Sequence, residues 1–399
     1  MEDDDLNPDT KKYIKNTSKE KRHEMGQFFT PQDKCRELFR KLPEEVKQER
    51  DLKVLDPASG TGEFLDSAIE FFSNADVYGW EKDKNLVDIS EKIVPEANIK
   101  NVDSLFYNPN IKFDLVVGNP PYYEINIDER LRKSYDDIIY GRTNIYSLFI
   151  YKSLQVLKSG GHLAFIVPPS MNNGAYFKKL RKYIIENCSI EYMEIQEDCD
   201  IFQDASQPVM FLVLKKGGDN DDYIFSKNSI SIFSEKADYL EEEFKGKKSL
   251  SEIGYKVTTG SFTWNENREK LVKDESSDCV LIWSKNILED GLEIGLDVHD
   301  KPQYVKDVDC NTGPAIVVNR VIGQPGNGEI RAAFIEEGMD FVAENHVNVI
   351  EHKDGCSIGY DKLLSQIRDN ENVELLQSIT GNSQLSKTEL QELFPVKVS

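Results

Sequence analysis

A short apolar segment, 52–55, runs directly into a glycine-rich turn, and this junction most limits the folds open to the chain. The turn reads Asp-Pro-Ala-Ser-Gly-Thr-Gly over 56–62, and a helix-like run follows over 64–72. A strand, a glycine-rich turn and a helix form the first βα unit of a doubly wound, mostly parallel α/β sheet, in which ligands bind at the carboxyl ends of the strands. Gly60 and Gly62 permit a tight turn and close approach of a ligand to the backbone.

The residues around this turn indicate what kind of ligand it binds. Asp66 stands where the third glycine of a dinucleotide fingerprint would fall, and no lysine of a phosphate-binding loop is present. A phosphate-bearing ligand is therefore not favoured. Asp56 and Glu63 add negative charge, which suits a ligand with an amino or sulfonium cation.

Two further acidic residues follow predicted strands. Glu81 ends the run 77–81 and lies 19 residues after Gly62, where a carboxylate can accept hydrogen bonds from both hydroxyls of a ribose. Asp103 ends a third predicted strand and could accept from the amino group of a cofactor adenine. Each acid alone also fits a solvated loop. Suitable residues at successive strand ends favour a cofactor site.

A second apolar segment, 114–118, leads into Asn119-Pro120-Pro121-Tyr122. The tetrapeptide offers two hydrogen-bond acceptors, the side-chain carbonyl of Asn119 and the backbone carbonyl of Pro120, which has no N–H to compete. Pro121 restricts the turn, and Tyr122 can stack on a ring. The alternative interpretation is a proline-rich surface turn. The motif otherwise predicts a site that holds a planar ring by an exocyclic amino group.

With these motifs, nearly the whole chain resembles the gamma class of S-adenosylmethionine-dependent N6-adenine DNA methyltransferases of type II restriction–modification systems. Gly26-Gln27-Phe28-Phe29-Thr30-Pro31 is similar to the N-terminal cofactor-binding segment of that class. The resemblance implies a seven-stranded methyltransferase sheet and a second, mixed α+β target-recognition domain. It also implies that S-adenosylmethionine is bound by Phe29, Thr30, Asp56, Pro57, Ala58, Gly60, Gly62, Glu81, Asp103 and Asn119.

The implied activity is methyl transfer to N6 of an adenine that is flipped out of a specific short sequence in double-stranded DNA. Asn119, Pro120 and Tyr122 would be the catalytic residues. Phe202, in a segment similar to a family loop over 201–209, would join Tyr122 in stacking on the target base. We expect weaker DNA contacts from basic residues of both domains: Lys178, Lys179, Arg181, Arg320 and Arg331.

The alternating strand and helix pattern ends near 214, and a polar, glycine-containing linker follows over 215–222. We therefore expect a catalytic domain over 1–218 and a DNA-reading domain over 219–399. Three alternatives remain open: a methyltransferase acting on a protein glutamine amide, an RNA methyltransferase, and a DNA-binding module that has lost the reaction. The additional C-terminal residues favour a polynucleotide substrate.

The charge of the chain is unusual for a DNA-binding protein. The formal net charge is −22, and residues 219–399 hold 19 Lys and Arg against 34 Asp and Glu. Local basic patches can still bind DNA, so we expect steeply salt-dependent binding. The six scattered cysteines predict reduced thiols and no metal site. No membrane segment or signal peptide is evident. We expect a cytoplasmic monomer, and a separately encoded cognate endonuclease remains open.

Overall fold

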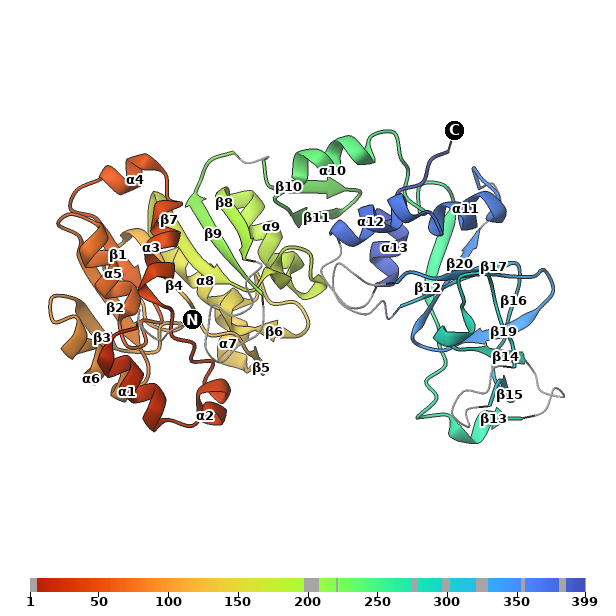
Figure 1. Cartoon of the computed structure of the whole chain (residues 1–399), viewed down its shortest axis with the longest axis horizontal. Coiled ribbons are helices and arrows are strands. Elements are labelled where there is room, and N and C mark those ends of the chain that lie inside the picture. The colour runs from red at the N-terminus through yellow and green to blue at the C-terminus, as the bar shows by residue number, and fades with distance from the viewer. Residues whose placement is uncertain are drawn as a thin grey trace. The chain divides into compact units, whose positions relative to one another are not determined.

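A computed structural model of the chain describes residues 6–196, 208–219, 222–273, 279–295, 302–320, 329–352, 356–379 and 385–398. The chain forms two compact units (Figure 1). The first comprises Met1–Ile224 and Ser231–Ala237, and the second comprises Phe225–Ile230 and Asp238–Ser399. The chain therefore passes between the units three times.

A seven-stranded sheet with the order β3-β2-β1-β4-β7-β9-β8 organises the first unit. All neighbours from β3 to β7 pair in parallel, whereas β9 is antiparallel to both β7 and β8. The predicted doubly wound, mostly parallel sheet is thereby confirmed. The strands are β1 (Lys53–Asp56), β2 (Asp76–Glu81), β3 (Asn98–Asn101), β4 (Phe113–Gly118), β7 (Leu157–Val167), β8 (Cys188–Gln196) and β9 (Val209–Lys216).

Neighbouring side chains along each strand point to opposite faces of the sheet. Apolar side chains on both faces pack against helices. On β4, Val116 belongs to a buried core that includes side chains of α8 and α9. Leu115 and Val117 belong to a second core that includes side chains of α3 and α5. The helices of the unit are α1 (Pro8–Asn16), α2 (Lys19–Glu24), α3 (Gln32–Arg40), α4 (Glu44–Gln48), α5 (Glu63–Phe71), α6 (Lys84–Ile93), α7 (Glu129–Tyr135), α8 (Ile145–Val156) and α9 (Lys178–Asn187).

Two short pairs of strands complete this part of the chain. Strands β5 (Glu124–Ile125) and β6 (Thr143–Asn144) pair in antiparallel fashion shortly after the Asn-Pro-Pro-Tyr turn. Strands β10 (Ile224–Lys227) and β11 (Ile230–Phe233) form a two-stranded sheet where the chain passes between the units.

The second unit contains two further sheets, and their strands are short. The four-stranded sheet has the order β12 (Tyr255–Thr259), β20 (Val347–His352), β17 (Ala315–Asn319) and β18 (Ala332–Ile335). The five-stranded sheet has the order β13 (Leu271–Val272), β15 (Tyr304–Val305), β14 (Cys279–Ile282), β19 (Asp340–Ala343) and β16 (Asn311–Thr312). The helices are α10 (Ala237–Phe244), α11 (Tyr360–Ile367), α12 (Asn370–Ile379) and α13 (Lys387–Leu393).

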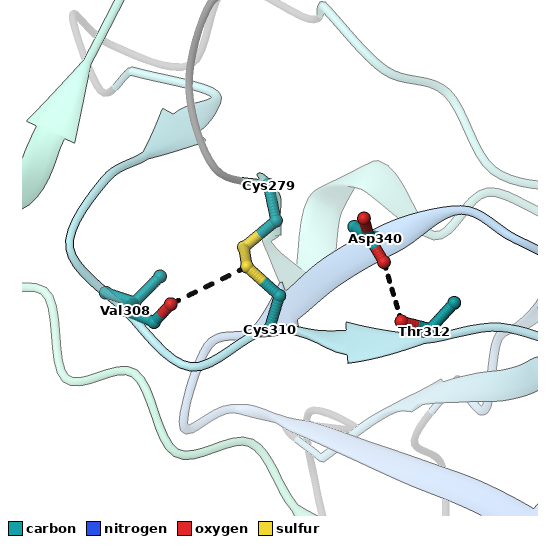
Figure 2. The surroundings of a disulfide bond; sticks show 5 residues. All are labelled: Cys279, Val308, Cys310, Thr312 and Asp340. Atoms are coloured by element: carbon teal, nitrogen blue, oxygen red, sulfur yellow. Dashed lines mark hydrogen bonds between the residues drawn. A yellow bond between two sulfur atoms is a disulfide. The ribbon is translucent and has the colours of Figure 1, made fainter.

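A disulfide joins Cys279, at the start of β14, to Cys310, which immediately precedes β16 (Figure 2). The prediction that all six cysteines are reduced thiols is therefore wrong for this pair. The bond links residues 31 positions apart, with no motif to mark it, and restricts the conformations open to the unfolded segment. Cys35, Cys188 and Cys356 are free, whereas Cys199 lies outside the described residues.

Two kinds of feature are absent from the residues that the structure describes. No helix there is long and apolar enough to cross a membrane. No group of three or more His, Cys, Asp or Glu side chains in the same residues is placed to hold a metal ion.

Candidate active site

A cavity of about 490 Å³ lies at the carboxyl ends of the parallel strands in the first unit. The strand order reverses between β1 and β4, which is where doubly wound sheets open a crevice for a ligand. The cavity is lined by Met25, Gly26, Gln27, Phe28, Phe29, Thr30, Asp56, Pro57, Ala58, Ser59, Gly60, Thr61, Glu63, Phe64, Trp80, Glu81, Lys82, Asp83, Leu86, Asp103, Ser104, Leu105, Asn119, Pro121, Tyr123, Ile145 and Phe149. Its size suits a ligand of nucleoside dimensions.

Asp56 is the buried acid at the end of β1. Its side chain is 2% exposed, and Oδ1 accepts a hydrogen bond of 2.9 Å from the backbone N–H of Ala58. Burial, with a smaller effect from the charge of Glu81, raises the pKa of Asp56 to about 8. Gly118, at the end of β4, has φ +148°, and a Cβ there would lie 2.8 Å from Oδ1 of Asp56. Glycine at this position thus allows the end of β4 to approach the acid.

The acids after β2 and β3 have partners within the unit. Glu81 accepts hydrogen bonds from the backbone N–H groups of Gly60 (3.0 Å) and Asp83 (2.8 Å). Burial raises the pKa of Glu81. Asp103 Oδ2 lies 3.0 Å from Nζ of Lys82. The carboxylate of Glu81 therefore fixes the glycine-rich turn and also lines the cavity.

Asn119 extends into the cavity from the end of β4, and the protein fixes the orientation of its amide. Its Nδ2 lies 3.0 Å from Oγ1 of Thr30 and 3.4 Å from the backbone carbonyl of Phe28. Its Oδ1 accepts a hydrogen bond from the hydroxyl of Tyr122. That hydroxyl is also 2.8 Å from the backbone carbonyl of Ile166. The N-terminal segment and the Asn-Pro-Pro-Tyr turn are thus joined through one side chain.

The ring of Tyr122 is half-buried between two other rings. Phe28 stacks on it, with ring centroids 5.8 Å apart and an interplanar angle of 22°. Tyr146 contacts it edge-on, with centroids 6.1 Å apart. Tyr122 does not line the cavity, whereas the next residue, Tyr123, does. A planar ligand can therefore reach the stacked face of Tyr122 only if Phe28 moves.

Comparison with known proteins shows what this chain is similar to. Residues 36–202 match the Eco57I restriction-modification methylase family. The chain is 28% identical to the modification methylase CviBIII of Paramecium bursaria Chlorella virus NC1A, over 96% of this chain and 97% of the relative. It is 24% identical to the type II methyltransferase M.CvrRI of Paramecium bursaria Chlorella virus XZ-6E, over 96% of each chain.

The chain is a restriction–modification DNA methyltransferase. Its cofactor is S-adenosylmethionine. Among solved structures, the methyltransferase is similar to a type I restriction-modification methyltransferase subunit from Streptococcus thermophilus, with a TM-score of 0.41 and 17% identity. That similarity covers 55% of this chain and 53% of the other.

The cavity of the methyltransferase fits this cofactor. Ser59 Oγ and Glu63 Oε2 are buried at the cavity and have no hydrogen-bond partner among the described residues. Unsatisfied buried acceptors are costly unless a ligand supplies donors. Asp56, Glu63 and Glu81 line the cavity with carboxyl groups, to which Ser59 adds a hydroxyl, and such a lining suits a cationic ligand.

The structure gathers most of the residues predicted from the sequence to bind the cofactor at the cavity wall. Gly62 is the exception, since it does not line the cavity, and neither do Pro120 and Tyr122, which were predicted to be catalytic. Gly62 instead caps α5 with φ +98°. Phe202, predicted to stack on the target base, lies outside the described residues.

The predicted DNA contacts of the methyltransferase have different surroundings. Lys178 is exposed, and Nζ of Lys179 donates to the backbone carbonyl of Asp136. Arg181 is 4% exposed, and its guanidinium donates to the backbone carbonyls of Ser231, Met171 and Gly174. The prediction that Arg181 contacts DNA is therefore wrong, because its donors are used inside the first unit.

The two arginines predicted in the second unit are partly buried. Arg320 donates from Nη1 to the backbone carbonyl of Asn345 at 2.8 Å. Arg331 has Nε 3.8 Å from Oε2 of Glu329. Both remain predicted DNA contacts.

Several cavity residues escaped prediction. Tyr123 follows the recognised tetrapeptide directly, and Ile145 and Phe149 lie one turn apart on α8. The spacing of four residues on an apolar helix could have indicated that Ile145 and Phe149 share a face. Nothing in the sequence distinguishes a helix face toward a cavity from one toward a packed core.

We expect cofactor binding by the methyltransferase to release a proton near pH 7. Asp56 is largely protonated at pH 7, because its pKa is about 8, and a cationic ligand favours the ionised carboxylate. Cofactor affinity should therefore rise as the pH rises toward 8, by at most about tenfold per pH unit for one proton. Calorimetry in buffers of different ionisation enthalpy measures the released protons. Asp56→Asn should bind more weakly and release fewer protons; an unchanged proton count would contradict this role.

Proposed function

We propose that this DNA methyltransferase modifies the N6 amino group of adenine within a specific short sequence, as a gamma-class enzyme. The observation that carries the proposal is the position of Asn119. It lies at the end of β4 in the same cavity as the acids after β1, β2 and β3, with its amide oriented by Thr30 and Tyr122. An amide at this place suits an exocyclic amine.

The chemistry follows from the weak nucleophilicity of adenine N6, whose lone pair is delocalised into the ring. When bound, S-adenosylmethionine supplies an electrophilic methyl group. Asn119 Oδ1 and the backbone carbonyl of Pro120 would accept the two N6 hydrogens, favour a tetrahedral nitrogen and stabilise the positive charge that develops there. Electrostatic preorganisation and positioning of the reacting atoms would then provide the rate enhancement. No strong general base is required, since the N6 proton becomes acidic once the methyl group is attached.

Asn119 must exchange partners for this to occur. Its Oδ1 accepts a hydrogen bond from the hydroxyl of Tyr122, so the incoming amino group would replace that hydroxyl. The hydroxyl of Tyr122 retains the backbone carbonyl of Ile166 as a second acceptor at 2.8 Å. Tyr122 would therefore stay hydrogen-bonded while Asn119 binds the base, and the exchange leaves no buried donor unsatisfied.

Adenine within a duplex cannot reach the cavity, so we propose that it is flipped out and stacked. Tyr122 would contact one face of the base, with Phe202 on the other. The ring of Phe28 stacks on Tyr122 and would be displaced by the base. We further propose that the second unit reads the target sequence, that the enzyme acts as a monomer, and that any cognate endonuclease is a separate chain.

Transfer of labelled methyl groups tests the proposal. Purified enzyme and tritiated S-adenosylmethionine would be incubated separately with unmodified DNA, RNA and a protein extract. We expect label in DNA alone, recovered as N6-methyladenine after digestion, and clustered at one short sequence when positions are mapped. Label in cytosine, in RNA or in glutamine would replace the proposed substrate with another.

A further inference from the structure

The chain between β5 and β6 links the catalytic turn to a distinct part of the surface. Strand β5 begins two residues after Tyr122, and its partner β6 brings the chain back to the same place. The backbone N–H of Ile145 then donates to the carbonyl of Tyr123 at 2.9 Å. Figure 1 labels both strands. Residues just before β6 are therefore anchored to the turn that holds Asn119.

Four side chains at this place form what we call the tyrosine–cation patch: Tyr140, Arg142, Tyr176 and Lys178. The two tyrosines are 41% and 46% exposed. Nζ of Lys178 lies 3.6 Å from the ring centroid of Tyr140, and Cζ of Arg142 lies 5.7 Å from that of Tyr176. Tyr176 packs against Gly141, where a Cβ would meet its ring at 2.6 Å. The two segments are thus joined at the surface, and each ring is paired with a cation.

The cations of the patch are poorly neutralised. Among the described residues, Lys178 has no ion pair, and it is exposed. Arg142 is 3.2 Å from Oε2 of Glu124, but both side chains are more than half exposed, so water screens this pair strongly. Surfaces that bind nucleic acids combine basic side chains with exposed aromatic rings, and this patch has both. The net charge of −22 repels DNA elsewhere, so backbone contacts must be local.

We propose that the tyrosine–cation patch binds the phosphodiester backbone of the DNA beside the flipped base. Arg142 and Lys178 would each neutralise one phosphate, and Tyr140 and Tyr176 would hold them in place. Because β5 and β6 pair, binding of the DNA phosphates at the patch would also help to position the Asn-Pro-Pro-Tyr turn. This inference rests on the proposed function, because it requires duplex DNA as the substrate.

The test uses the full-length enzyme and a short, fluorescently labelled duplex that carries the mapped target site. Affinity would be measured by anisotropy between about 50 and 200 mM salt for the wild type and the double variant Arg142→Ala/Lys178→Ala. We expect affinity to fall about tenfold or more, and the slope of log affinity against log salt to flatten by nearly two, since about 0.9 counterions are released per phosphate contact. Cofactor affinity should not change.

Two single variants provide controls. Lys182→Ala removes an exposed lysine from the same helix, one that pairs with Glu186 at 3.7 Å, and should bind DNA as the wild type does. Glu124→Gln removes the acid beside Arg142 and should tighten DNA binding several-fold, an effect that a purely structural role for the patch would not produce.

The outcomes separate this inference from the proposed function. If the wild type methylates DNA and the double variant keeps its affinity and salt slope, the patch is not a DNA contact and only this inference fails. If the wild type neither binds nor methylates DNA, the proposed function fails with it. Melting temperatures of the variants equal to the wild type would show that lost binding is not lost folding.

Discussion

Replacement of Asn119 by alanine is expected to lower the rate of methyl transfer on the order of a thousandfold, a loss comparable to removing one preorganised group from a transition-state site. Cofactor affinity should stay within a few-fold of the wild type, because the acids Asp56 and Glu81 are untouched. The structure gives the reason for the large effect. The amide nitrogen is held by Thr30 and by the carbonyl of Phe28, so the amide need not rotate when the N6 group replaces the Tyr122 hydroxyl at its oxygen.

A matched variant separates two roles of Asn119: its side-chain oxygen as a hydrogen-bond acceptor, and its amide nitrogen as the donor that holds the side chain in place. Asn119→Asp keeps an oxygen but loses the N–H donation toward Thr30 and Phe28, and we expect activity between those of the alanine variant and the wild type. Single-turnover rates with labelled cofactor, together with calorimetric cofactor affinities, provide the comparison. Near-normal turnover in the alanine variant would remove Asn119 from the mechanism.

Substitution of Tyr122 is expected to have the second-largest effect on the methylation rate. Two variants should differ in how that loss depends on the base opposite the target adenine. Tyr122→Ala removes the stacking ring, which is worth about 1–3 kcal/mol per base, and should be partly rescued by a mismatched or abasic partner, because such a base flips at lower cost. Tyr122→Phe keeps the ring but not the hydroxyl that donates to Asn119 and Ile166. It should lose activity to the same extent on matched and mismatched duplexes.

Methylation rates on paired duplexes that differ only opposite the target adenine measure both effects. The ratio of mismatched to matched rates should rise for Tyr122→Ala and stay constant for Tyr122→Phe. If the ratio is constant for both variants, Tyr122 orients Asn119 but does not stack on the base.

Local sequence predicted the cofactor side of the site well, for a physical reason. Parallel strands end at one edge of a sheet, so Asp56, Glu81, Asp103 and Asn119 had to gather once their strands were recognised. Apolar residues followed by turns marked β1, β2 and β4, whereas β3 (Asn98–Asn101) has Ile99 as its one apolar residue.

The base side of the site depended on packing that local sequence does not encode. Two tyrosines follow Pro121, and after two prolines no strand periodicity indicates that Tyr123 lines the cavity while Tyr122 lies under Phe28. Arg181 was wrongly predicted to contact DNA. The prediction relied on the basic residues around it and overlooked its position between Leu180 and Ile184, which are buried.

The second unit was harder still to predict. Several of its strands have only two residues, which is too short for alternation to be recognised. Its disulfide joins cysteines that no motif pairs. Sequence therefore indicated that a second domain exists and gave no account of its sheets.

The chain returns to the first unit over Ser231–Ala237, and this return determines where a truncated fragment of the protein can end. The carbonyl of Ser231 accepts from Arg181, the N–H of Phe233 donates to the carbonyl of Asn172, and the Phe233 ring is buried in the core beneath α8 and α9. A fragment truncated at the linker near residue 218 would lack all three contacts and leave a buried guanidinium short of an acceptor. A fragment meant to fold alone must extend to residue 237, and therefore carries a loop of the other unit with it.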